Sequence, residues 1–281
     1  MPDLTNPTAV LAVLRKHNLA LRKKYGQNFL VDRNILEKVV AAANITKDDC
    51  VLEIGPGLGT MTALLAERAG RVVAVEIDRL LIPVLAETLA GYDNVTVLNE
   101  DIMKTDIDQF GQPPHPLKAV ANLPYYITTP VVMKLLEHKP PFSSLTLMVQ
   151  KEVAARMQAA PGTKDYGALS LAVQYYAKAE VVATVSPSCF IPKPKVESAL
   201  VSLVPYEKPP VGVADEGQLF AVIRAAFGQR RKTLANALSG LVSDKEAIVN
   251  ALQMMGLAET IRGEALTLAQ FAEISAKIRE N

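Results

Sequence analysis

The stretch Val51-Leu-Glu-Ile-Gly55-Pro-Gly57-Leu-Gly59-Thr60 decides the fold that we predict for this chain. Its apolar start is typical of a buried strand, its closely spaced glycines of a tight turn, and the residues from Thr60 onward of a helix. Glycine suits such a turn because the backbone needs unusual angles and because a ligand must approach the main chain closely. The stretch therefore predicts a strand, a ligand-binding turn and a helix in an α/β fold.

The same alternation of strand and helix patterns continues from about residue 50 to residue 205. It is typical of a parallel sheet with helices on its faces. The predicted strands are 50–54, 71–76, 95–98, 118–122, 145–149, 180–185 and 197–204. The predicted helices are 33–43 with Asp32 as its N-cap, 60–69, 79–90, and a helix ending near Glu137 with Thr129 as its N-cap and Pro130 in its first position.

Prolines at 205, 209 and 210 interrupt this pattern, and the remainder of the chain is predicted to be helical. Within that remainder, Ser243 to Glu246 and Thr267 to Gln270 both have the spacing of a capping box. We predict three parts, namely a basic N-terminal extension (1–24), a ligand-binding domain (25–208) and a small all-α domain (209–281).

The composition is that of an ordinary globular protein, with 281 residues, 49% of them hydrophobic and 21% charged. Cys50 and Cys189 lack the spacing of a disulfide framework or a metal site, which favours a reducing compartment and no bound metal. The N-terminus has no signal-peptide pattern, and no apolar run is long enough to span a membrane. We therefore expect a cytoplasmic protein without membrane contacts.

The net charge of +1 does not by itself indicate a nucleic-acid partner, but the basic residues are unevenly distributed. One cluster lies near the N-terminus and a second, free of acids, lies after the predicted domain boundary. Either cluster alone is compatible with a solvated face. The candidate RNA-binding residues are Arg22, Lys23, Lys24, Arg224, Arg230, Arg231 and Lys232.

Acidic residues follow the next two predicted strands. Glu76 lies 21 residues after Gly55, where a carboxylate can accept hydrogen bonds from ribose hydroxyls. Asp78 we assign mainly to capping the following helix. Thr60 takes the place of the third glycine of the dinucleotide motif, so the spacing is G-x-G-x-G. This spacing resembles the first motif of class I S-adenosylmethionine methyltransferases, in which an acid such as Asp101 binds the cofactor's adenine.

The segment Asn122-Leu-Pro-Tyr125 follows the fourth predicted strand and resembles the signature of methyltransferases that act on amino groups. An exocyclic amine donates its lone pair into the ring, so it is a poor nucleophile until acceptors hold its two N–H bonds. The side-chain oxygen of Asn122 and the carbonyl of Leu123 can accept these bonds, Pro124 fixes the turn, and Tyr125 can stack on the base. No catalytic base is needed, and we expect His115 and His138 at the surface.

With Tyr25-Gly-Gln-Asn-Phe-Leu30 and Phe190-Ile-Pro-Lys-Pro-Lys-Val196 added, residues 25–240 resemble one family. It is the small-subunit ribosomal RNA adenine dimethyltransferase family, which includes the KsgA-type enzymes and is related to the erythromycin-resistance methylases. The resemblance implies a Rossmann-like, mostly parallel seven-stranded sheet whose last strand is antiparallel. It also implies S-adenosylmethionine as cofactor and transfer of two methyl groups to each of two adjacent adenosines near the 3′ end of small-subunit rRNA.

The resemblance assigns site residues in two groups. The catalytic residues that it implies are Asn122, Leu123, Pro124, Tyr125 and Phe190, of which Phe190 packs on the flipped base. The cofactor residues that it implies are Gln27, Asn28, Leu30, Glu53, Gly55, Gly57, Gly59, Glu76, Ile77, Asp101, Ile102 and Asn122. The helical domain is expected to help dock the pre-ribosomal small subunit, and the protein is expected to be monomeric.

Three alternatives remain open at the level of sequence. A DNA adenine methyltransferase would share the chemistry, although Leu123 and the Gln-Asn-Phe-Leu segment disfavour it. The chain could instead act mainly as an assembly checkpoint that binds pre-ribosomes, with methylation secondary. A nicotinamide-dependent oxidoreductase is disfavoured by Thr60.

Overall fold

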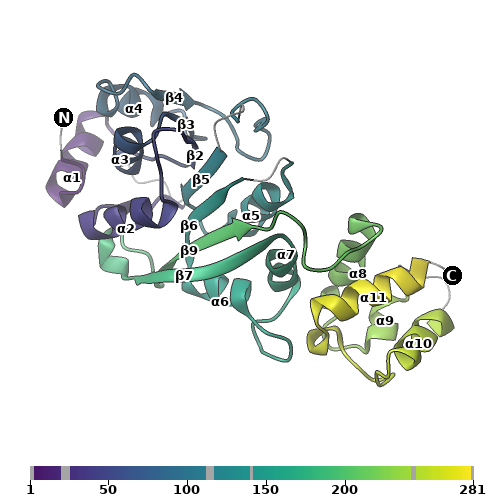
Figure 1. Ribbon diagram of the computed structural model, residues 1–281. Coiled ribbons are helices and arrows are strands. Elements are labelled where there is room, and N and C mark those ends of the chain that lie inside the picture. The colour runs from purple at the N-terminus through teal and green to yellow at the C-terminus, as the bar shows by residue number, and fades with distance from the viewer. Residues whose placement is uncertain (1–2, 20–25, 112–116, 140–141, 242–244, 280–281) are drawn as a thin grey trace. The chain divides into compact units, whose positions relative to one another are not determined.

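A computed structural model describes the chain in five ranges: 3–19, 26–111, 117–139, 142–241 and 245–279. The chain divides into two compact units (Figure 1): Met1–Ala154 with Ala179–Pro205, and Ala155–Lys178 with Tyr206–Asn281. The sequence placed residues 155–178 in the ligand-binding domain, whereas their contacts group them with the helical C-terminal residues. Among the described residues, no helix is long and apolar enough to cross a membrane.

The first unit is built on a seven-stranded sheet in the order β4-β3-β2-β5-β6-β9-β7. Its strands are β2 (Cys50–Ile54), β3 (Arg71–Val75), β4 (Val95–Leu98), β5 (Leu117–Asn122), β6 (Ser144–Gln150), β7 (Ala177–Val185) and β9 (Ser198–Pro205). All seven predicted strands are present, within three residues of the predicted limits. The β4 to β6 part of the sheet is parallel, and β9 runs antiparallel to β6, as the family resemblance implied.

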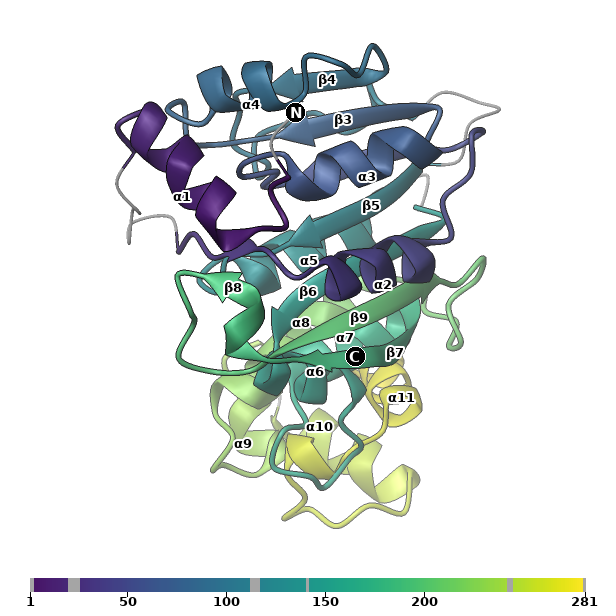
Figure 2. The ribbon, with the colours of Figure 1, turned by 90° about the vertical axis from the view of Figure 1, so that its left-hand side faces the viewer.

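Helices pack on this sheet and complete its hydrophobic core. They are α1 (Pro7–Lys16), α2 (Arg33–Ala43), α3 (Thr60–Arg68), α4 (Ile82–Thr88), α5 (Thr128–Glu137) and α6 (Lys151–Gln158), the last of which crosses into the second unit. In Figure 2, α2 and α3 lie side by side over one face of the sheet. As predicted, the side chain of Asp32 caps α2 by accepting from the Ile35 amide at 3.1 Å.

Two predicted helix starts are wrong, and local hydrogen bonds explain both. The helix predicted from Arg79 begins at Ile82, because the Asp78 carboxylate accepts from the amide of Leu80 and holds residues 78–81 in a turn. The helix with Thr129 as its predicted N-cap begins at Thr128, whose hydroxyl donates to the Pro124 carbonyl. Asp78 therefore caps this turn and not α4 itself.

Helix α1 was not predicted. Its buried face (Val10, Val13 and Leu14) packs in one cluster with Leu81 and Leu85. The Lys16 ammonium and the His17 ring lie 2.6 and 3.0 Å from the two carboxylate oxygens of Glu87. Helix α1 and His17 after it are thus docked on α4.

The second unit is helical. It contains α7 (Ala168–Tyr176), α8 (Glu216–Gly228), α9 (Leu234–Leu238), α10 (Lys245–Met254) and α11 (Leu268–Arg279). Its core includes Tyr176 stacked on Phe220, with ring planes 9° apart. The capping box at α11 is confirmed, because the Gln270 amide donates to the Thr267 hydroxyl and the Thr267 amide donates to the Gln270 side chain. The capping box predicted from Ser243 begins outside the described residues.

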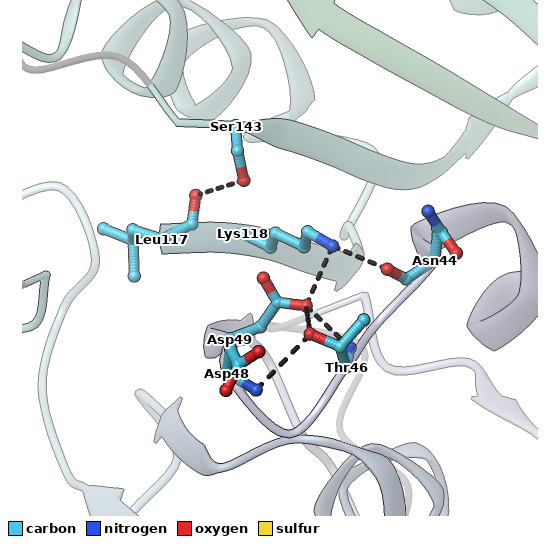
Figure 3. A network of polar contacts seen from close by, with 7 residues as sticks. All are labelled: Asn44, Thr46, Asp48, Asp49, Leu117, Lys118 and Ser143. Carbon is cyan, nitrogen blue, oxygen red and sulfur yellow. Dashed lines mark hydrogen bonds and ion pairs between the residues drawn. The ribbon is translucent and has the colours of Figure 1, made fainter. Parts of the chain in front are cut away.

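A buried ion pair stabilises the amino-terminal ends of β2 and β5 (Figure 3). The Lys118 ammonium lies 2.9 Å from the Asp49 carboxylate and donates to the Asn44 carbonyl at 2.6 Å. Asp49 also accepts from the amide and the hydroxyl of Thr46. Burial alone would raise the pKa of Asp49, but the bonds from Lys118 and Thr46 outweigh it and hold that pKa below its usual value.

We predict that Lys118→Met destabilises the protein by about 3 kcal/mol, because it leaves a buried carboxylate without its countercharge. The double variant Lys118→Met/Asp49→Asn should recover part of that loss, since it removes the charge as well. Since the pKa of Asp49 is lowered, the contribution of the pair is present above the ordinary value of 3.8 and is lost as the pH falls below it. Urea unfolding at pH 7 measures the free energy of unfolding of the wild type, the single variant and the double variant. Equal stability of the two variants would contradict the prediction.

Candidate functional site

A pocket opens where the carboxyl ends of β2, β3 and β5 meet. The space between its wall atoms amounts to about 1060 Å³, and this figure includes open solvent. Parallel pairing brings these strand ends together, because Ile54 is in register with both Val75 and Ala121. The pocket gathers most of the predicted site residues: Gln27, Asn28, Leu30, Glu53, Gly55, Gly57, Glu76, Ile77, Asp101, Ile102, Asn122, Leu123, Pro124, Tyr125 and Phe190.

The glycine turn forms one wall of the pocket. Gly55 and Gly57 have φ angles of +70° and +61°, which L side chains rarely adopt. A Cβ on Gly57 would lie 3.0 Å from the Phe29 ring, so this position also needs the small residue for packing. Gly59, which the sequence predicted as a cofactor residue, is not among the residues that line the pocket. It precedes α3 with a φ of +86°, and a Cβ there would lie 3.0 Å from the hydroxyl of Thr88.

Glu76 follows β3 and is almost fully buried. Its two carboxylate oxygens accept from the amides of Asp78 at 2.8 Å and of Gly57 at 3.2 Å. Burial raises the pKa of Glu76 to about 7, although both amide bonds oppose the rise. Each carboxylate oxygen has a second lone pair, so Glu76 can still accept bonds from ligand hydroxyls.

Glu53 in β2 is fully buried, and neither of its carboxylate oxygens has a hydrogen-bond partner among the described residues. Burial raises the pKa of Glu53 to about 8, and the nearby hydroxyl of Thr62 lowers it only in part. A buried carboxyl without a partner costs free energy, so Glu53 is a candidate for a contact that a ligand supplies.

Asp101, after β4, also lines the pocket. Its carboxylate accepts a hydrogen bond from the amide of Met103 at 2.9 Å. Ile77 is 44% exposed, whereas Ile102 is buried. An exposed isoleucine and an acid in one pocket wall can bind the face and the amine of a purine. The sequence predicted Asp101 as the acid at the cofactor's adenine amine, and Ile77 and Ile102 as cofactor residues without a stated role.

The segment Asn122 to Tyr125 leaves β5 and forms the pocket's second wall. The Asn122 amide nitrogen donates to the carbonyl of Asn28 at 2.9 Å. No described residue donates to the Asn122 side-chain oxygen or to the Leu123 carbonyl, so two neighbouring acceptors stay available to a ligand. The Tyr125 hydroxyl is 3.1 Å from that of Ser198, which fixes the ring.

Phe190 lines the pocket and is also part of the hydrophobic core, since it is only 1% exposed. It lies in β8 (Phe190–Ile191), which pairs with β1 (Phe29–Leu30) in a separate two-stranded sheet. The rings of Phe190 and Tyr125 do not stack on each other.

Sequence reasoning missed several residues of this pocket. Tyr126 is 56% exposed in the pocket wall and packs near Gly26. Phe29, Met61 and Glu100 also line the pocket. The Gln27 side chain donates to the Asp78 carboxylate at 3.0 Å, a contact between residues 51 positions apart that no local pattern indicates. For Tyr126, its place directly after Tyr125 was the only signal.

His138, which the sequence placed at the surface, does not line the pocket. The His138 ring lies 2.9 Å from the Asp108 carboxylate, and His115 lies outside the described residues.

The predicted RNA-binding residues of the helical unit differ in their surroundings. Arg224, Arg231 and Lys232 are exposed. Arg230 is partly used within the protein, because it pairs with Glu264 at 3.2 Å and lies over the Phe227 ring. The other three candidates, Arg22, Lys23 and Lys24, lie outside the described residues.

Comparison with known proteins decides the family. The sequence profile described as "Ribosomal RNA adenine dimethylase" matches residues 18–280. The chain belongs to this family. "Ribosomal RNA small subunit methyltransferase A" of Lachnoclostridium phytofermentans is 54% identical over all of this chain and 99% of that protein. The protein of the same name from Streptococcus pneumoniae D39 is 49% identical over 95% of both chains.

Two solved structures of similar proteins agree with this result. A dimethyladenosine transferase from Plasmodium falciparum has a TM-score of 0.76 at 29% identity, over 89% of this chain and 96% of that one. The 23S rRNA methyltransferase ErmE has a TM-score of 0.67 at 28% identity, over 90% of this chain and 100% of that one. The family resemblance, the predicted fold and the predicted cofactor are thereby confirmed.

This rRNA adenine dimethylase is an S-adenosylmethionine-dependent methyltransferase. The pocket fits that cofactor. The buried, unpartnered carboxyl of Glu53 calls for a polar ligand group, and the remaining lone pairs of Glu76 suit vicinal hydroxyls. At Gly55 a Cβ would meet no atom within 4 Å, so open space adjoins the backbone there.

We predict that Glu53→Gln stabilises the cofactor-free dimethylase at pH 9. The pKa of Glu53 is about 8 in the folded chain against an ordinary value of 4.5, so ionisation costs folding stability as the pH rises through this range. A neutral amide avoids that cost, with a gain on the order of 5 kcal/mol at pH 9 and little gain at pH 4. Urea unfolding of the wild type and of Glu53→Gln at both pH values measures this difference in the free energy of unfolding.

Glu207→Gln is the matched control, because Glu207 is exposed. It should leave the stability at both pH values unchanged. A Glu53→Gln effect that is equal at pH 4 and pH 9 would show that packing, and not ionisation, is responsible.

Proposed function

We propose that this dimethylase transfers two methyl groups to each of two adjacent adenosines in a loop near the 3′ end of small-subunit rRNA, during assembly of that subunit. The support is the near full-length similarity to several bacterial proteins named for small-subunit rRNA methylation, at 48–54% identity. Adenine amine chemistry is supported by the two unpartnered acceptors at Asn122 and Leu123.

Catalysis in this proposal comes from positioning. S-adenosylmethionine, when bound, supplies an electrophilic methyl group. The side-chain oxygen of Asn122 and the carbonyl of Leu123 accept the two N–H bonds of the adenine amine and draw its lone pair out of the ring. The amine is then held for an in-line displacement, in which fixed orientation supplies much of the rate. The proton left on the product amine is lost readily to water, consistent with a pocket that no described histidine lines.

The remaining pocket residues bind and cover the reactants. Tyr125, fixed by Ser198, and Phe190, fixed by the core, are proposed to hold the flipped base between them. Glu76 would accept hydrogen bonds from the ribose hydroxyls of the cofactor. Asp101 would accept a hydrogen bond from the cofactor's adenine amine. The glycine turn, Glu53, Ile77, Ile102 and residues 27–30 complete the cofactor site.

The proposed macromolecular partner is the pre-ribosomal small subunit. Arg224, Arg231 and Lys232 of the helical unit, with Arg22, Lys23 and Lys24, are proposed to contact phosphates, because basic side chains supply most of the affinity for RNA. We propose that the enzyme acts as a monomer in the cytoplasm. A checkpoint role that rests on binding of pre-ribosomes, with methylation secondary, is a second candidate, and the exposed cations of the helical unit support it.

Incubation with labelled S-adenosylmethionine and undermethylated small subunits, followed by digestion of the RNA, should give labelled dimethyladenosine. Asn122→Ala should lower kcat by about 10²- to 10³-fold, because one of two acceptors for the amine is lost. It should keep its affinity for small subunits. Label in DNA, or only monomethyladenosine, would contradict the proposed substrate, and full activity of Asn122→Ala would contradict the proposed site.

Neutralising the helical cluster tests the docking surface. Arg231→Gln/Lys232→Gln should weaken binding to small subunits about tenfold at moderate salt and reduce the slope of log affinity against log salt by roughly 2. Lys208→Gln, at another exposed lysine, is the matched control and should have a smaller effect. An unchanged salt slope in the double variant would remove these residues from the interface.

A further inference from the structure

The segment of residues 26–31, here called the strap, contributes residues 26–30 to the pocket wall and is paired with β8. Phe29 and Leu30 of β1 are in register with Ile191 and Phe190. The amide of Val31 extends the pairing by donating to the Cys189 carbonyl at 2.9 Å. The strap thus connects directly to the aromatic residue proposed to face the base.

The strap is rigidly anchored by its apolar side chains. Phe29 is 8% exposed and packs in the cluster that contains Leu58 and Leu81. Leu30 is 6% exposed and packs in the other cluster, with Leu36. Consecutive side chains are therefore buried in two different cores, which fixes the position of the peptide group between Asn28 and Phe29.

The carbonyl oxygen of that peptide group accepts the hydrogen bond from the Asn122 side chain at 2.9 Å. A carbonyl can only accept, so the amide nitrogen of Asn122 has to face it. The carboxamide is planar and its two polar atoms diverge, so the side-chain oxygen is directed away from the strap. In the opposite orientation two oxygens would face each other with no hydrogen between them, which costs the bond and adds repulsion.

At its other end the strap reaches the residues proposed to bind the cofactor's ribose. Gln27 donates to the Asp78 carboxylate at 3.0 Å. The Asp78 amide in turn donates to Glu76 at 2.8 Å. One short segment therefore contacts both the cofactor edge and the base edge of the pocket.

We propose that the backbone carbonyl of Asn28 is a positioning group for methyl transfer, which holds the Asn122 carboxamide with its oxygen directed toward the adenine amine. The inference rests on the proposed function, in which that oxygen accepts from the amine. It adds that the Asn122 nitrogen is required too, as the donor that keeps the oxygen in place.

The test measures how kcat of the Asn122→Asp variant, relative to that of the wild type, depends on pH. An ionised carboxylate has two acceptors and no donor, so it repels the Asn28 carbonyl. A protonated carboxyl has one donor and one acceptor, which restores the wild-type pattern. The ratio of variant to wild-type kcat should therefore rise as the pH falls, by up to tenfold per pH unit above the pKa of the new carboxyl.

The opposite result is expected if Asn122 only has to accept. An ionised carboxylate is then the better acceptor, and the ratio should stay flat or rise with pH. Division by the wild-type rate at each pH removes the effects that variant and wild type share from the other ionisable groups lining the pocket, namely Glu53, Glu76, Glu100, Asp101, Tyr125 and Tyr126. A flat or rising ratio would overturn the inference while leaving the proposed function intact, provided that Asn122→Ala is inactive. Full activity of Asn122→Ala would instead overturn the proposed function.

A measurement on the wild-type protein tests the contact without relying on activity or on the folding of a variant. In ¹⁵N spectra of the cofactor-free enzyme, the side-chain amide protons of Asn122 should exchange with water at least about tenfold more slowly than those of a free side chain. Asn34, which is exposed on α2, is the reference. Equal exchange rates for the two side chains would contradict the proposed contact.

Discussion

The parallel pairing of β2 with β3 and with β5 is the constraint on which the site depends. Three strands in register end at one edge of the sheet, so the turns that follow them lie close together. The glycine turn after β2, Glu76 after β3 and Asn122 at the end of β5 line one pocket for this reason. The sheet's hydrophobic core thus fixes the distance between the cofactor residues and the base residues.

Buried carboxyl groups at the two ends of these strands differ in whether the protein supplies a partner for them. At the amino-terminal end, Asp49 is paired with Lys118 and bonded to Thr46, so its charge is compensated within the protein. At the carboxyl end, Glu53 has no partner and its pKa is raised by burial to about 8. A compensated carboxylate can stay charged inside the protein, whereas Glu53 is mostly protonated at neutral pH and keeps hydrogen-bonding capacity for a ligand.

The strap adds a backbone group and a side chain that contact residues of the site. Because its side chains are held in two core clusters, its polar groups can be directed at Asp78 and at Asn122 with little freedom. The proposed catalytic amide is therefore oriented by main chain from a segment 94 residues away, and not by its own neighbours.

The sequence by itself determined the strands, the glycine turn, the acids after the strands and the Asn-Leu-Pro-Tyr turn. These features are local: period, turn chemistry and strand ends depend on residues close in the chain. It misjudged the starts of α4 and α5 by three and two residues, since hydrogen bonds of Asp78 and Pro124 shift these helix starts.

Only the tertiary structure decided that α1 docks on α4, that Gly59 packs against Thr88 outside the pocket, and that Arg230 is held by Glu264. It also decided which way the Asn122 amide faces. Each of these depends on contacts between residues far apart in sequence, and such contacts are set by how the buried faces fit together, which no local pattern specifies.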